Sequence, residues 1–202
     1  MNNRRLPVSI ITLKLVRPRL EVYYPMVIGS KNLAVQNKVN DAIQNLVQQL
    51  IREQGYYENS MTQITGYYEI KTNERGILSL ALINDAYSGG AHGLTVIKSI
   101  TADLETGKIY NLQDLFKPDS NYVERISDIV EKKIKDRNIY LLGDFKGIRP
   151  DQDFYIADKA LVIYFQLYEL TSYAFGFPYF PISVYDIKEI ISEDSPFDRL
   201  IY

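Results

Sequence analysis

Cysteine and tryptophan are absent from this chain of 202 residues, and histidine occurs once. Without cysteine the protein has no disulfides, no thiol nucleophile and no cysteine-ligated zinc site. Neither sign of charge is in excess, because 23 basic and 25 acidic side chains give a net charge of −2. Phosphate backbones are bound by clustered Lys and Arg, so this interleaved charge argues against nucleic acid as a partner.

Long apolar runs are also missing, and no stretch reaches the ~18 residues of a membrane span. The apolar stretch at 6–16 is interrupted by Pro7, Ser9, Thr12 and Lys14. A signal peptide needs an unbroken apolar segment followed by small residues at a cleavage site. The N-terminus as given therefore predicts a cytoplasmic protein without membrane insertion.

The composition is that of a globular protein, with 46% hydrophobic and 24% charged residues. Its unusual feature is the aromatic content, with 17 Tyr and 8 Phe. The length favours a single domain over residues 1–202, and a division into two sub-lobes at about 1–110 and 111–202 stays open.

Two segments have the three- and four-residue apolar spacing of amphipathic helices. Residues 32–54 carry the clearest stripe, which ends at Gly55, and residues 119–137 carry a second one with Asp119 or Ser120 as candidate N-caps. We expect both to be long helices.

The remaining periodic segments predict strands, many of them joined as hairpins. Within the strand segment 77–85, both alternating sets of residues 77–83 are largely apolar, which predicts a central strand buried on both faces. The predicted fold class is α+β, with an antiparallel sheet built from hairpins and the two long amphipathic helices packed on it. The strand segments are 9–16, 20–24, 63–72, 77–85, 94–104, 154–157 and 160–165.

The most unusual local sequence is YSGGAHG at 87–93. Its glycines and serine can direct N–H groups at a ligand, so Ser88, Gly89, Gly90 and His92 are candidate ligand-binding residues. No strand-then-helix context with a phosphate lysine surrounds them, which excludes a P-loop. The structural alternative is a glycine-rich connection between two central strands.

His92 invites a catalytic interpretation, with Asp85 or Asp103 as its partner in a cell-wall sugar hydrolase. A single histidine cannot form a histidine-based metal site unless carboxylates supply the other ligands. Ser88 lies four residues from His92 on the same loop, without a nucleophile elbow. We therefore expect no catalytic set, no metal and no cofactor.

A second unusual segment, residues 173–181, combines five aromatic residues with two prolines and a glycine. Rigid aromatic side chains dominate binding interfaces, so Phe177 and Tyr179 are candidate contacts with a ligand. In the structural alternative, Phe175 and Phe180 fill the core and the prolines end strands.

Several stretches together resemble the extracytoplasmic modules of the RsiV and PdaC type. The likeness covers the chain from about Leu13 to Tyr185. The stretches are VYYP at 22–25, VNDAI at 39–43, YSGGAHG at 87–93, DLETGK at 103–108, LQDLF at 112–116, LVIYF at 161–165, YEL at 168–170 and YAFG at 173–176.

This resemblance implies a non-catalytic α+β binding module at the cell surface, with a lysozyme-like protein or a cell-wall glycan as its ligand. In RsiV-like proteins the module binds lysozyme, and in PdaC-like proteins it accompanies a separate deacetylase domain. A self-associating structural protein, whose tail at 197–202 packs on a neighbour, is a further alternative. The oligomeric state stays open.

Overall fold

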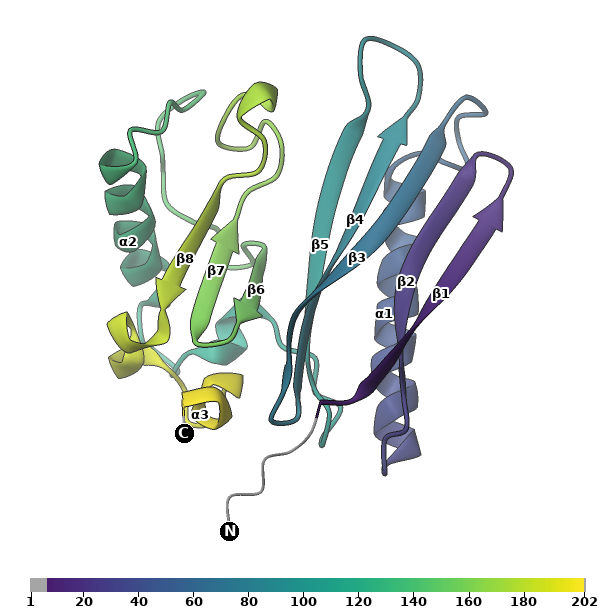
Figure 1. The fold of residues 1–202 in the computed structure, drawn as a ribbon. Helices are drawn as coiled ribbons and strands as arrows, with labels where there is room; N and C mark the ends of the chain where they lie inside the picture. The colour runs from purple at the N-terminus through teal and green to yellow at the C-terminus, as the bar shows by residue number, and fades with distance from the viewer. Residues whose placement is uncertain (1–6, 202) are drawn as a thin grey trace. The chain divides into compact units, whose positions relative to one another are not determined.

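The computed structural model describes residues 7–201, which divide into two compact units, one ending at Ile109 and the other beginning at Tyr110 (Figure 1). Both units combine helices with sheet, so the predicted α+β class is confirmed. Within the described range no helix is both long and apolar enough to cross a bilayer.

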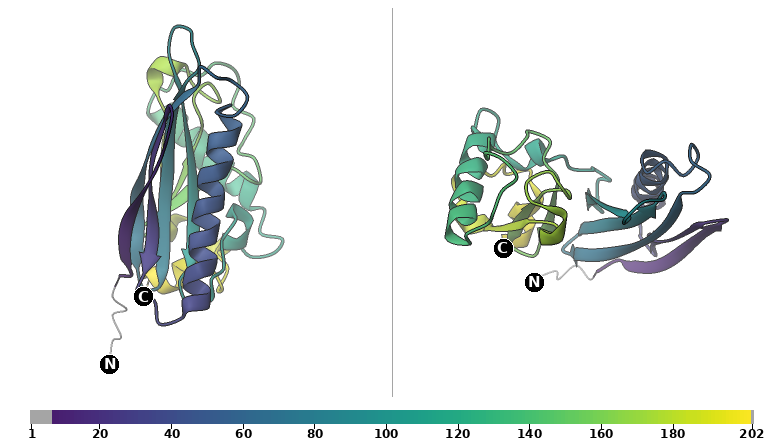
Figure 2. Two further views of the ribbon diagram at one scale, coloured as in Figure 1. Left: turned by 90° about the vertical axis from the view of Figure 1, so that its right-hand side faces the viewer. Right: turned by 90° about the horizontal axis from the view of Figure 1, so that it is seen from above.

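The first unit is a five-stranded sheet in the order β1-β2-β3-β4-β5, with one long helix, α1, along one of its faces (Figure 2). The elements are β1 (Ser9–Arg17), β2 (Leu20–Ile28), α1 (Leu33–Glu53), β3 (Gln63–Glu74), β4 (Ile77–Tyr87) and β5 (Leu94–Asp103).

The prediction of a purely antiparallel sheet is wrong for this unit. Three of its strand pairs are antiparallel, but β2 and β3 run parallel, with residues 20–22 beside residues 64–66. Because α1 lies between β2 and β3 in the chain, it returns the chain to the starting end of the sheet, as a parallel pair requires. The hairpins on either side are antiparallel as expected.

Helix α1 follows its sequence pattern closely. The side chain of Asn32 accepts hydrogen bonds from the N–H groups of Ala34 and Val35 and so caps the first turn. Gly55 follows the last turn with φ +77°, a conformation that glycine adopts at little cost. The buried stripe faces the sheet and comprises Val35, Val39, Ile43, Val47, Leu50 and Ile51.

A polar contact ties α1 to β2 within this apolar interface. The Asn40 side chain accepts a hydrogen bond from the Val27 N–H at 2.8 Å and donates one to the Val27 carbonyl at 2.9 Å. Val27 is fully buried, so these backbone groups depend on the amide for their pairing.

Replacing Asn40 by Ala should lower the free energy of unfolding by about 1–3 kcal/mol, since it leaves two backbone groups unpaired. Asn37→Ala is the matched control, because Asn37 is exposed on the same helix. Urea unfolding of both variants measures the difference. Equal stability of the two would show that the Asn40–Val27 pairing contributes nothing.

Strand β4 lies between β3 and β5, and its residues 77–84 are all buried. This confirms the prediction of a central strand buried on both faces. Ser79 pairs its hydroxyl with that of Thr101 on β5 at 2.8 Å, which satisfies two buried polar groups.

The β1–β2 hairpin carries an exposed charge cluster. The Tyr23 hydroxyl donates to the Glu21 carboxylate at 2.8 Å, the Lys14 ammonium lies 3.1 Å from the same oxygen, and it also lies over the Tyr23 ring. The Tyr23 hydrogen bond, followed by that of Lys14, lowers the pKa of Glu21 below its ordinary value of 4.5.

Because the folded-state pKa of Glu21 is depressed, the cluster stabilises the fold above the unfolded-state pKa and loses this effect as pH falls through the folded-state pKa. NMR titration of the Glu21 side chain should give a pKa below the ordinary value. Lys14→Met should raise it, while Lys38→Met on α1 should leave it unchanged. A Glu21 pKa at its ordinary value in the unmodified protein would contradict the cluster.

The second unit is a three-stranded antiparallel sheet, in the order β6-β7-β8, with helix α2 and several short helical turns. The apolar stripe of α2 buries Ile126, Val130 and Ile134. Its elements are α2 (Tyr122–Asp136), β6 (Phe154–Ala157), β7 (Ala160–Tyr164), β8 (Tyr179–Ser183) and α3 (Pro196–Ile201), with 3-10 turns at Leu112–Leu115, Tyr173–Phe175, Val184–Asp186 and Lys188–Ile190.

The proposed role of the C-terminal tail in self-association is wrong. Phe197 and Leu200, on the short helix α3, are buried within the chain. Their apolar surface is already covered, so it is not available to a neighbour. Tyr202 lies outside the described residues.

Candidate functional site

The glycine-rich segment at 87–93 forms the loop between β4 and β5. Gly89 and Gly90 have φ of +91° and +112°, values that side-chain-bearing residues rarely adopt. The Tyr87 hydroxyl donates to the Gly90 carbonyl at 3.0 Å and closes the turn. The loop joins β4 to β5 and exposes Gly89 and Gly90; the structural alternative expected two central strands, but only β4 is central, because β5 lies at the edge of the sheet.

Ser88 anchors this loop. Its hydroxyl lies 2.9 Å from the hydroxyl of Thr62, a fully buried residue just before β3. A hydroxyl held in this way fixes the start of the loop.

His92 is exposed, and its Nδ1 lies 2.8 Å from the Gly93 carbonyl oxygen. Asp85 adjoins the same loop, because a Cβ on Gly93 would lie 3.2 Å from both of its carboxylate oxygens. The Asp85 carboxylate also accepts a hydrogen bond from Thr95 Oγ1 at 2.8 Å. The structure thus brings Asp85 to the loop that carries His92.

Asp103 lies at the other end of β5, roughly 30 Å from the start of that strand at ~3.3 Å per residue. Its carboxylate accepts hydrogen bonds from the N–H groups of Glu105 and Thr106 and so caps a turn. The pairing of His92 with Asp103 is therefore wrong. Among residues 7–201, no three His, Cys, Asp or Glu side chains gather closely enough to hold a metal ion.

The aromatic segment of the second unit divides between core and surface. Phe180 is fully buried, as the structural alternative expected, whereas Phe175 is 45% exposed and does not fill the core. Phe177 and Tyr179, expected to be the exposed members, are half-buried. Tyr179 packs against Tyr155 and Tyr164 at ring distances of 6.2 and 5.9 Å, and Phe177 lies beside it.

An aromatic rim, made of Tyr168, Tyr173 and Phe175, lies between β7 and β8 in the chain; Phe175 is exposed and Tyr173 is half-buried. Tyr168 is 50% exposed, and its ring lies 5.7 Å from that of Tyr173. Tyr168 was not among the predicted contacts; its backbone is left-handed (φ +66°), and nothing in the local sequence pattern indicates its exposure.

A polar network fixes the turn that carries the rim. The Glu169 carboxylate accepts hydrogen bonds from the Gln166 N–H at 2.7 Å and from the Gln152 amide at 3.3 Å, and it forms an ion pair with Arg149. Gln152 is buried and also donates to the Tyr164 carbonyl at 2.9 Å. These contacts fix the turn at 166–169 that carries Tyr168, and a preformed turn lowers the entropy cost of binding.

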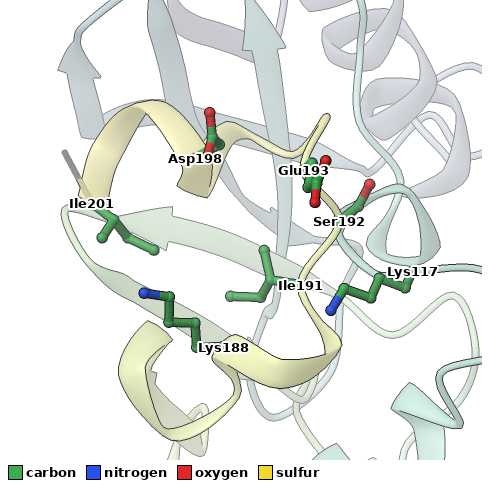
Figure 3. Close-up of a pocket in the computed structure, with 7 residues that line it drawn as sticks. All are labelled: Lys117, Lys188, Ile191, Ser192, Glu193, Asp198 and Ile201. Atoms are coloured by element: carbon green, nitrogen blue, oxygen red, sulfur yellow. The ribbon is translucent and has the colours of Figure 1, made fainter.

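A separate hollow of about 410 Å³ opens near the C-terminal helix (Figure 3). The Lys117 ammonium donates to the Glu189 carbonyl at 2.7 Å and stands at its edge. Side chains of both charge signs line the hollow. Its lining residues are Lys117, Lys188, Ile191, Ser192, Glu193, Asp198 and Ile201.

Two family models match the chain, one in each unit. Residues 18–95 match the model described as "Deacetylase PdaC", and residues 113–185 match "Protein of unknown function (DUF3298)". The chain is thus similar to the PdaC model in its first unit and to the DUF3298 model in its second, and this confirms the predicted resemblance.

One curated relative is the peptidoglycan-N-acetylmuramic acid deacetylase PdaC of Bacillus subtilis (strain 168). It is 25% identical over 133 residues, which cover 62% of this chain and 28% of that protein. The chain thus matches less than a third of that protein's length.

Solved structures of two DUF3298 family proteins share the fold. The protein from Bacteroides fragilis NCTC 9343 superposes with a TM-score of 0.70 at 14% identity over 99% of each chain. That from Pseudomonas aeruginosa PAO1 gives 0.69 at 13% identity, over 96% of this chain and 97% of its own. At these identities the likeness concerns the fold alone.

Alanine at Tyr179 should lower the free energy of unfolding by about 1–3 kcal/mol, because its ring packs against two other tyrosines. Alanine at the exposed Phe175 should change it by no more than about 0.5 kcal/mol. Thermal unfolding of both variants checks this division. A larger loss for Phe175→Ala would place that ring in the core.

Proposed function

We propose that this protein is a non-catalytic binding module of the cell envelope, of the RsiV and PdaC type, and that its ligand is a cell-wall glycan. One observation carries the proposal: the aromatic rim has two exposed rings, Tyr168 and Phe175, and begins on a turn fixed by Glu169, inside the DUF3298 region. A preformed aromatic surface on rigid support is a common feature of recognition sites.

A glycan ligand is favoured over a lysozyme-like protein for two reasons, which are the fit between sugar rings and aromatic side chains and the similarity to PdaC. A sugar ring presents a face of C–H groups that packs flat on an aromatic ring, while tyrosine hydroxyls bind its hydroxyls. The curated relative is named for action on peptidoglycan. The similarity to PdaC also supports a location outside the cytoplasm, whereas the N-terminus predicted a cytoplasmic protein.

Ser88, Gly89, Gly90 and His92 are proposed as a second contact region, in the first unit. The exposed loop offers backbone N–H groups and one imidazole to a polar ligand. Phe177 and Tyr179 are proposed to support the rim rather than to contact the ligand, since both are half-buried in the tyrosine cluster.

The geometry around His92 supports a role without catalysis. Asp103 is remote, Asp85 is engaged by Thr95, and the Ser88 hydroxyl is engaged by Thr62. The cell-wall hydrolase alternative keeps one supporting fact, which is that Asp85 and His92 adjoin the same loop.

Pelleting with purified peptidoglycan tests the proposal, with soluble lysozyme offered in parallel. Tyr168→Ala and Phe175→Ala should each weaken binding to peptidoglycan about tenfold, through loss of one stacking contact. Tyr185→Ala is the matched control, because this tyrosine is 55% exposed in the same unit and lies outside the rim.

Unchanged pelleting of both rim variants would overturn the proposed site. Capture of lysozyme alone, lost in the same variants, would replace the glycan with a protein ligand. Release of soluble sugars from peptidoglycan by the wild-type protein, abolished by His92→Ala, would instead establish an enzyme.

A further inference from the structure

Strand β1 lies at one end of the five-stranded sheet of the first unit (Figure 1). It pairs with β2 along its whole length, from Ser9 to Arg17, and in the described part of the chain no strand pairs with its other edge. An edge of nine residues is long enough to bind another strand.

The register identifies which backbone groups are open. Pro25 has no N–H and lies opposite Thr12, so this pair is a non-hydrogen-bonded one. Because such pairs alternate with hydrogen-bonded ones, Ile10, Thr12, Lys14 and Val16 direct their N–H and C=O groups away from β2.

Val8 lies two residues before Ile10, so its backbone groups should also point away from β2, and its contacts support this assignment. Its N–H donates to the Asn73 side chain at 3.1 Å, and its carbonyl accepts from the same amide at 2.9 Å. The side chain of Asn73 thus takes the place of a neighbouring strand at this residue. The open part of the edge begins at Ile10.

The open edge lacks the usual protection against pairing. The register from Ser9 to Arg17 has no bulge, and prolines occur only outside these bounds. Ile11 and Val16 are 39% and 59% exposed. The single lysine of the strand, Lys14, is held by Glu21 on the neighbouring strand.

We propose that two copies of this protein associate through β1, antiparallel and centred on Leu13, so that their sheets become continuous. The inference is independent of the ligand proposed above. A two-fold pairing of identical strands is closed, which gives a dimer rather than a fibre.

The side chains select this register. In the dimer, residues whose backbone groups point outward must lie opposite each other, so the two-fold axis passes through a residue. The registers that pair most of the strand have this axis at Thr12, Leu13 or Lys14. A centre at Thr12 would place Val16 opposite Val8, whose backbone is occupied by Asn73. A centre at Lys14 would oppose two like charges, which is destabilising.

With the centre at Leu13, apolar side chains meet apolar ones. Ile11 lies opposite Leu15, Ile10 opposite Val16, and the two copies of Leu13 face each other. The exposed apolar surface of the strand is thereby covered, and each Lys14 lies opposite a threonine of the other copy.

Sedimentation equilibrium of the full chain tests the association. Wild type should be dimeric at high concentration, and Thr12→Pro should raise the dimer dissociation constant at least about tenfold, since it removes an outward N–H on each copy. Thr12→Val is the matched control, because it loses the same hydroxyl contact with Tyr68 but keeps the N–H. A monomeric wild type, or equal dimerisation of both variants, would overturn the proposal.

The absence of cysteine permits a test of register that leaves β1 free of proline. Leu13→Cys should form a disulfide-linked dimer under mild oxidation, because the two Cβ atoms of a non-hydrogen-bonded pair lie close together. Val16→Cys should not, since its two copies are separated by six residues, or roughly 20 Å, along the strand. Equal crosslinking of both variants on a non-reducing gel, or none of Leu13→Cys, would contradict the register.

Discussion

The packing of one helix stripe against one sheet face underlies the whole first unit. The buried side chains of α1, from Val35 to Ile51, cover an apolar face to which β2, β3 and β4 all contribute. Burial of this kind stabilises by about 25 cal/mol per Å² of apolar surface, and it is the main favourable term in folding. Because α1 must lie along that face, the chain leaves β2 at one end and enters β3 at the other. The parallel pairing and the hairpins on both sides follow from this constraint.

The spacing of apolar residues was enough to predict most helices and strands, because an element that buries one face has apolar side chains at regular intervals. Residues 32–54 predicted α1 to within a residue at each end, and the doubly apolar run at 77–85 predicted the central position of β4. The direction of β2 relative to β3 was not predictable in this way, since it depends on where a helix sends the chain. The start of α2 also differs: Asn121 precedes the first turn in a left-handed conformation, where Asp119 or Ser120 was expected as a cap.

The candidate site was predicted less well, and the reason is again physical. An aromatic residue has the same sequence signature whether its ring fills a core or faces water, so the pattern at 173–181 could not separate Phe175 from Tyr179. Their environments are decided by distant partners, namely Tyr155 and Tyr164 for Tyr179, and Arg149 and Gln152 for the turn at Glu169. The glycine-rich loop was located correctly because two glycines with positive φ leave a clear local signal.

The brevity of the parallel contact between β2 and β3 has a mechanical consequence. Only residues 19–22 of the hairpin join its backbone to β3 among the described residues, while β3 continues beside β4 to Glu74. Beyond Val22 the hairpin is held by side chains, such as Asn40 on α1 and Asn73 on β3, rather than by a strand. A pulling force on the N-terminal strand is therefore borne by a short row of backbone bonds, a few amide side chains and the apolar packing of β2 on α1.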